Sequence, residues 1–108
     1  MLVHSRTARI ALLLIAVHLA VRAVLAFGGY FYWDDLILVG RAGTQPLLSP
    51  AYLFDDHDGH VMPAAFLLAG TITRLAPLNW VGPALSLVVL AALAALALLR
   101  ALYVILGW

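Results

Sequence analysis

The chain has 108 residues, of which 66% are hydrophobic and only 10% are charged, and its mean hydropathy is +1.08. Soluble domains are typically about 45–50% apolar and about 25% charged, so this composition argues against a soluble domain and excludes a disordered tail. The formal net charge of +1 excludes a nucleic-acid-binding protein, which needs a basic surface. The absence of cysteine excludes disulfides and thiolate zinc sites. We expect an all-α membrane protein, with residues 1–108 forming a single membrane module.

The charged residues are sorted along the chain. All five acids are aspartates in one short window: Asp34, Asp35, Asp55, Asp56 and Asp58. Arg41 is the only one of the six arginines between positions 34 and 60, so five acids face one base there and the formal charge is −4. A mixed soluble surface would not separate charges in this way. A membrane protein with one functional aqueous loop would.

The first predicted element is a membrane helix over about residues 10–30. These 21 residues are almost wholly apolar and would span roughly 31 Å, about the thickness of a hydrocarbon core. The apolar run is long for a signal peptide and no clean cleavage site follows it, so we expect an uncleaved anchor. The aromatic residues at positions 30–33 are typical of a membrane interface.

An outer loop over residues 34–60 is expected to contain short interfacial helices. Asp34 is predicted to N-cap an amphipathic helix that ends at Gly40 or Gly43. Ser49 and Pro50 have the pattern of an N-cap and a first helical position. Both pieces are expected to lie along the membrane surface.

Two further helices are predicted, over about residues 62–76 and 81–106, with a short turn that implies an antiparallel hairpin. The first of the two is short for a span, and tilt or local thinning of the bilayer would have to compensate. The expectation is therefore about three transmembrane helices in the cell membrane. The arginine distribution places the N-terminus in the cytoplasm and the acidic loop outside, with Arg100 as the one residue that disagrees.

Two polar groups in the loop are candidates for chemistry. Paired carboxylates at Asp34 and Asp35 can act as a general base or hold a divalent cation, or they can simply mark the helix boundary. The segment 55–60 (DDHDGH) is rich in oxygen and imidazole ligands for a cation such as Mg²⁺ or Mn²⁺, with the alternative that it is only a hydrophilic turn. His57 and His60 would share a face if the segment were helical.

A third candidate lies inside the first predicted helix. His18 and Arg22 are four residues apart and therefore lie on one helix face. An arginine within a span is costly and is a functional candidate by default. The alternatives are that it extends to the interface or pairs with another helix.

The order of these features resembles the N-terminal region of the GT-C superfamily of integral-membrane glycosyltransferases, of the protein O-mannosyltransferase and aminoarabinose-transferase type. The resemblance rests on the aromatic-acid-acid sequence ending at Asp34 and Asp35, the loop length, His60 and Pro63 at the start of the next helix, and the later Leu-Asn-Trp turn and Ala/Leu-rich helix. The sequence departs from the family in having two residues between His60 and Pro63.

The resemblance implies a function for several loop residues. Asp34, Asp35 and His60 match catalytic positions, with Asp34 as the base or the carboxylate that organises a metal. Arg41 and His57 are expected to bind the substrate, and Asp34 and Asp58 to hold the cation. Arg41 is the only basic residue of the outer loop that could neutralise the lipid phosphate of the donor. The implied donor is a polyprenyl-phosphate sugar in the membrane. Family members have many more helices, so the chain is expected to be a fragment truncated after the third helix, a split subunit or a degenerate relative. In each case it is expected to be inactive alone and to work with further transmembrane segments or subunits.

Two other functions stay open from the residues alone. A non-enzymatic accessory or assembly protein could use the acidic loop to bind a partner or a cation. A piece of a cation or proton transporter is a further alternative, but transporters usually carry acids within their spans, and here every acid lies in the loop. Under each of these hypotheses the partners of the chain include membrane lipid.

Overall fold

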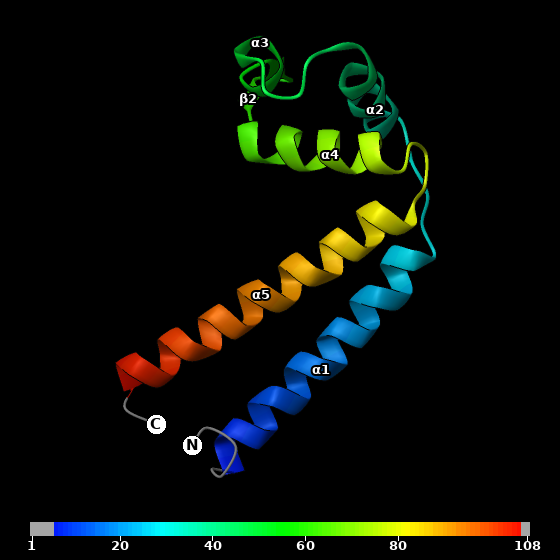
Figure 1. Ribbon diagram of the computed structural model, residues 1–108. Helices are drawn as coiled ribbons and strands as arrows, with labels where there is room; N and C mark the ends of the chain where they lie inside the picture. The colour runs from blue at the N-terminus through cyan, green and yellow to red at the C-terminus, as the bar shows by residue number, and fades with distance from the viewer. Residues whose placement is uncertain (1–5, 107–108) are drawn as a thin grey trace. The chain divides into compact units, whose positions relative to one another are not determined.

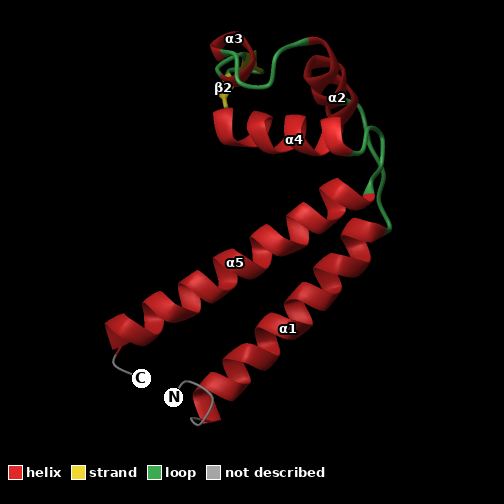
Figure 2. Ribbon diagram, in the orientation of Figure 1, coloured by secondary structure: helices red, strands yellow, loops and turns green. Residues whose placement is uncertain are grey.

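The computed structural model describes residues 6–106 and is 75% helical. Its elements, in chain order, are α1 (Arg6–Phe27), α2 (Asp34–Thr44), α3 (Pro50–Leu53), β1 (Asp56–His57), β2 (His60–Val61), α4 (Pro63–Leu75) and α5 (Val81–Leu106). The expected all-α class is confirmed, and the single exception among the described residues is the small hairpin of β1 and β2 (Figure 2). The chain divides into two compact units, one of residues 1–29 and 84–108 and one of residues 30–83.

The first unit is a pair of long antiparallel helices, α1 and α5. They run in opposite directions, so the start of α1 and the end of α5 lie at the same end of the pair (Figure 1). Helix α1 begins and ends a few residues earlier than predicted, whereas the bounds predicted for α5 agree with the structure. Both helices present bulky apolar side chains to the outside: Val24 is 75% exposed and Leu98 is 61% exposed.

Two helices, α1 and α5, are long and apolar enough to cross a membrane. A core helix of a soluble protein would be mostly buried, but none of the most apolar stretch of α1 is buried, and only 6% of that of α5. The span expected at residues 62–76 is not confirmed. The helix found there, α4, has 13 residues and would cover only about 20 Å of a core about 30 Å thick.

The second unit, residues 30–83, is here called the loop module. In it α4 packs against α2 and α3, which lie on one side of it (Figure 1). Its small core consists of Ala42 from α2, Tyr52 from α3 and Phe66 from α4, each 1% exposed. Leu38, Leu47 and Leu53 pack around these residues. The apolar face of α4 is therefore used for packing within the loop module.

The two ends of the loop module are close together in space. The Phe31 ring lies 5.1 Å from the Trp80 ring, and Tyr30 lies 6.5 Å from the same ring, measured between centroids. The Phe31–Trp80 pair is edge-to-face, an arrangement that contributes about 0.5–1.5 kcal/mol beyond its buried area. Asn79 then accepts a hydrogen bond from the Val81 backbone N–H at 3.0 Å and so caps the start of α5.

Candidate functional site: a carboxylate and histidine cluster

Asp34 and Asp35 open α2, and their side chains have different surroundings. Helix α2 begins at Asp34, and the residue before it, Trp33, has φ 36° and makes no side-chain capping bond. The prediction that Asp34 is the N-cap is therefore wrong by one position. The Asp35 carboxylate accepts a hydrogen bond from the Tyr32 backbone N–H at 3.0 Å. Asp35 thus satisfies the backbone where α2 begins, and both acids interact favourably with the positive end of the helix dipole.

The segment 55–60 forms a β-hairpin and not a helical turn. Asp58 and Gly59 occupy the turn with φ 51° and 81°, the two positive values that a type I′ turn requires. The Asp56 carboxylate accepts a hydrogen bond from the Gly59 backbone N–H at 2.6 Å. His57 and His60 are direct partners across the two strands, so they lie on the same face of the hairpin. They share this face because the strands pair, and not because of the helical spacing considered from the sequence.

His57 is held against the core of the loop module. Its imidazole meets the ring of Phe66 edge-to-face, with centroids 6.4 Å apart, and Phe66 is 1% exposed. His60, by contrast, is exposed. The buried phenylalanine therefore supports one histidine of the cross-strand pair and leaves the second on the outer surface.

Asp34, His57 and Asp58 come together in space. One potential ligand atom from each lies within 4.8 Å of the other two. Ligands at 2.0–2.6 Å from one ion stand about 3–5 Å from each other, so the spacing fits a shared cation. His57 is half-buried and the two aspartates are exposed, an arrangement that leaves further coordination positions open to water or a ligand.

The structure thus separates the predicted site residues into two groups. The cluster unites Asp34 and Asp58, the predicted cation ligands, with His57, which was predicted to bind substrate. It leaves out Asp35 and His60. No structural observation assigns those two a catalytic role, and Asp35 has a local explanation in its bond to Tyr32.

Arg41 forms an ion pair with Asp55. Its Nη1 atom lies 3.0 Å from Asp55 Oδ2, and the two side chains are 30% and 38% exposed. The Nη1 atom is itself buried, and it meets the carboxylate at ion-pair distance without the alignment of a hydrogen bond. The expected phosphate-binding arginine is therefore already engaged with a carboxylate of the chain.

Tyr52 and Gly70 pack behind Phe66, the residue that supports His57, and neither was singled out as a site residue from the sequence. The Tyr52 hydroxyl donates a hydrogen bond to the Phe66 carbonyl at 2.9 Å. Burial raises the pKa of the Tyr52 phenol, and the charge of Arg74 acts in the opposite direction. A Cβ atom at Gly70 would lie 2.6 Å from the Tyr52 hydroxyl oxygen, so glycine permits this close packing. The Asp58-Gly59 dipeptide, in contrast, is a known hairpin signal that could have predicted the turn.

Comparison with known proteins adds no relative: no protein-family model matches the chain, and neither does any curated protein or any solved structure.

Proposed function

We propose that the chain is a membrane-anchored module that holds a divalent cation at Asp34, His57 and Asp58 and acts in sugar transfer from a polyprenyl-phosphate donor. The observation that carries the proposal is the meeting of three ligand atoms within 4.8 Å of one another. The resemblance to GT-C glycosyltransferases supports the choice of reaction, because it assigns Asp34 to the catalytic acid that follows the first membrane helix.

In this proposal the chain crosses the membrane twice, through α1 and α5. Their length and their many exposed apolar side chains suit contact with lipid. Helix α4 then stays outside the bilayer core as part of the loop module, where its core contacts lie. Residues 30–83 as a whole would stand on one side of the membrane, and both ends of the described chain on the other.

The orientation follows from the charges on each side. Arg6, Arg9 and Arg100 flank the two spans at one end, and that end carries no acid. The loop module carries all five acids against Arg41 and Arg74. The positive-inside rule then places the chain ends in the cytoplasm and the loop module outside. With two spans, Arg100 agrees with this orientation, whereas with three spans it disagreed.

The chemistry of the cluster suits a cation that also contacts a phosphate. Mg²⁺ and Mn²⁺ prefer oxygen ligands with a small share of imidazole, and Mg²⁺ is commonly held by one or two carboxylates plus phosphate oxygens of a substrate. A bound cation would neutralise charge on the leaving lipid phosphate. Asp34 is exposed at the start of α2 and can accept a proton from an acceptor hydroxyl or orient the cation.

The experiment that tests the proposal is a Mn²⁺ titration of the full chain in nanodiscs, followed by electron paramagnetic resonance of the free ion. Asp34→Asn is expected to weaken Mn²⁺ binding by at least tenfold, because it removes a charged ligand. Asp35→Asn is the matched control, since it makes the same change one residue away on a side chain outside the cluster. Equal affinity of the wild type and Asp34→Asn would reject the proposed site.

The accessory-protein alternative shares the cation site but not the reaction. Membranes that contain the chain together with its native neighbouring membrane segments separate the two functions. Transfer of sugar from a polyprenyl-phosphate donor that is lost with Asp34→Asn and retained with Asp35→Asn would support the enzyme. Cation binding without any Asp34-dependent transfer would support the accessory function.

A further inference from the structure

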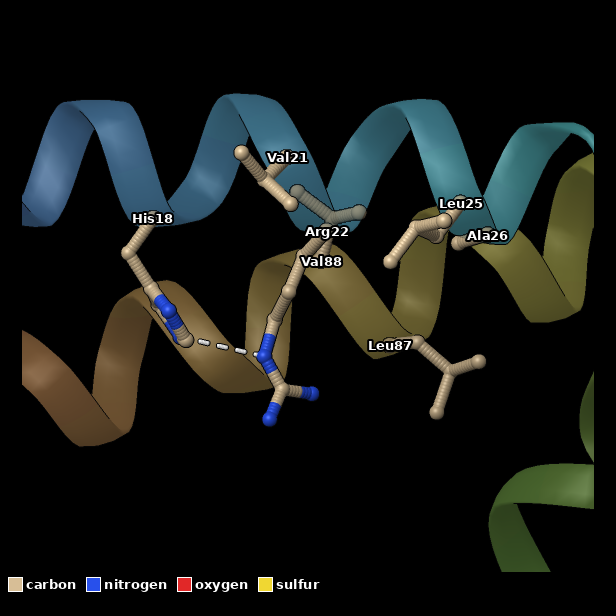
Figure 3. Close-up of a pocket in the computed structure, with 7 residues that line it drawn as sticks. All are labelled: His18, Val21, Arg22, Leu25, Ala26, Leu87 and Val88. Atoms are coloured by element: carbon tan, nitrogen blue, oxygen red, sulfur yellow. Dashed lines mark hydrogen bonds between the residues drawn. The ribbon is translucent and has the colours of Figure 1, made fainter.

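A groove lies between α1 and α5, with a volume of about 480 Å³. Its walls are mainly apolar, and its two polar side chains are His18 and Arg22, both on α1 (Figure 3). The remaining lining residues are Val21, Leu25, Ala26, Leu87 and Val88. A charged side chain thus faces a groove that, in the proposed placement, lies inside the bilayer.

The Arg22 side chain is directed back along α1 and away from the nearer membrane surface. Its Nε atom donates a hydrogen bond to His18 Nε2 at 3.0 Å (Figure 3). Side chains on a helix incline toward its N-terminus, and His18 is one turn nearer that end. Arg22 lies five residues before the end of α1 at Phe27, which is about 7.5 Å along the axis, and His18 lies about 13.5 Å from that end. The guanidinium is therefore held within the hydrocarbon layer.

The chain itself supplies no counter-charge at that depth. All five acids lie between positions 34 and 58, so neither span contains one. His18 accepts the Arg22 hydrogen bond through a ring nitrogen, and an imidazole supplies no carboxylate to balance the arginine charge. An unpaired arginine in a bilayer is costly, and such residues normally face a partner inside a helix bundle.

We propose that the groove receives a membrane-spanning helix of another segment or protein, and that an Asp or Glu on that helix pairs with Arg22. A second copy of this chain does not meet the requirement, because its spans carry no acid. A lipid phosphate lies outside the hydrocarbon core, whereas the bond to His18 turns the guanidinium away from that level. A carboxylate on a helix can reach the required depth, and the apolar walls suit helix packing.

His18 has a positioning role in this proposal. By accepting from Nε, it leaves both terminal nitrogens of the Arg22 guanidinium available, and these are the donors that bind a carboxylate in a two-pronged manner. His18 therefore sets the depth at which the partner acid pairs with Arg22. The inference rests only on the membrane placement proposed above, and not on the cation site or the transfer reaction.

The test uses the full chain in phosphatidylcholine nanodiscs with a donor dye attached through Thr7→Cys. The probe is a synthetic Leu/Ala membrane-spanning peptide that carries an acceptor dye and one Glu at the depth of Arg22. An otherwise identical peptide with Gln is the reference. The Glu peptide is expected to associate about three- to fifteen-fold more tightly, in line with measured polar contacts between membrane helices.

Variants of the chain identify the residue responsible. Arg22→Gln is expected to abolish the preference for the Glu peptide. Arg100→Gln, the same change on α5 outside the groove, should retain it. A series of peptides with the Glu at different depths tests the role of His18. His18→Gln keeps a hydrogen-bond acceptor for Arg22, so the depth of tightest association should not change. His18→Phe removes the acceptor, so that depth should shift toward the Phe27 end of α1. Helical content by circular dichroism shows that each variant is folded.

Several results would overturn the inference. Equal association of the Glu and Gln peptides with the wild type contradicts it without any variant. Retention of the preference by Arg22→Gln also contradicts it. Loss of the preference when phosphatidylglycerol is added would mean that Arg22 takes a lipid phosphate instead. Labelling of Ala16→Cys by a water-soluble thiol reagent would show that α1 does not cross the membrane. Mn²⁺ binding by Arg22→Gln should be unchanged, so the cation site and this inference can fail separately.

Discussion

The Arg41 guanidinium lies 3.0 Å from the Asp55 carboxylate, and this ion pair connects the last turn of α2 to the residue before the hairpin. It fixes one end of the segment that carries His57 and Asp58 against the helix that begins at Asp34. The pair therefore supports the spacing of the cluster without belonging to it. Both side chains are about one-third exposed, so solvent weakens their attraction.

A double-mutant cycle of Arg41→Ala and Asp55→Ala should show a modest coupling. We expect about 0.2–1 kcal/mol, decreasing as salt is raised, because partly exposed pairs are screened. Amide hydrogen exchange of α2 and α4 in the full chain measures the free energy of local opening. A coupling of zero at low salt would mean that the contact does not stabilise the loop module.

Gly70→Ala should destabilise the loop module. The new Cβ would lie 2.5 Å from Leu47 Cδ1 and 2.6 Å from the Tyr52 hydroxyl oxygen, which is itself bonded to the Phe66 carbonyl. Overpacking of this kind costs about 1–3 kcal/mol, measurable in thermal unfolding of the full chain in micelles. Gly43→Ala is the control, since nothing lies within 4 Å of its Cβ, and alanine there should stabilise α2 by about 0.5–1 kcal/mol. Equal effects of the two substitutions would contradict the packing described for Gly70.

Stability of the loop module should fall at alkaline pH through Tyr52. Burial raises the pKa of this phenol above 10.0, so the folded state retains the proton at pH values where the unfolded state has lost it. The resulting stability is complete below about pH 10 and is lost as the pH rises above that value. Thermal unfolding measured between pH 8 and pH 11, roughly the range around the ordinary pKa of tyrosine, would show the decline.

Tyr52→Phe should remove this alkaline component and, at neutral pH, cost about 0.5–1.5 kcal/mol for the hydrogen bond to Phe66. Tyr32→Phe is the matched control, because the Tyr32 side chain is 79% exposed. If Tyr52→Phe and Tyr32→Phe unfold with the same dependence on pH, the assignment to Tyr52 is wrong.

Single cysteines should distinguish two spans from three, because the native chain has none. With two spans, Phe54→Cys and Leu78→Cys are labelled from outside intact cells, and Leu106→Cys is labelled only from the cytoplasm. With three spans, Leu78 and Leu106 exchange sides. Within the protein, all three side chains are more than half exposed, so no other part of the chain shields them from membrane-impermeant reagents. Labelling of Leu106→Cys from outside would contradict the two-span placement.

The helices were largely predictable because their signals are local and strong. Long apolar runs indicate α1 and α5, and the Ser49-Pro50 start of α3 is confirmed by the hydrogen bond from the Tyr52 N–H to Ser49 Oγ at 3.2 Å. Whether α4 crosses the membrane or packs on other helices could not be predicted in the same way. An apolar helix of 13 residues can cross part of a bilayer or pack on its neighbours, and only the packing of its Phe66 against Ala42 and Tyr52 reveals which surface it covers.

The candidate site was predictable in its residues but not in its geometry. Asp34, His57 and Asp58 were each singled out by residue type, yet 23 positions separate Asp34 from His57, and local patterns do not report contacts at that range. The hairpin was missed because its strands have two residues each and lack an alternating apolar pattern. Arg41 was assigned to a phosphate for want of another basic residue in the loop, and its pairing with Asp55 is a tertiary contact.

The most direct measurement of the central claim is pulsed electron paramagnetic resonance of Mn²⁺ bound to the full chain in nanodiscs. The account predicts a nitrogen coupling from one imidazole that disappears in His57→Gln and persists in His60→Gln, its cross-strand partner outside the cluster. Asp34→Asn should weaken the binding itself. A nitrogen coupling that survives in His57→Gln, or Mn²⁺ that binds without any nitrogen ligand, would contradict the account.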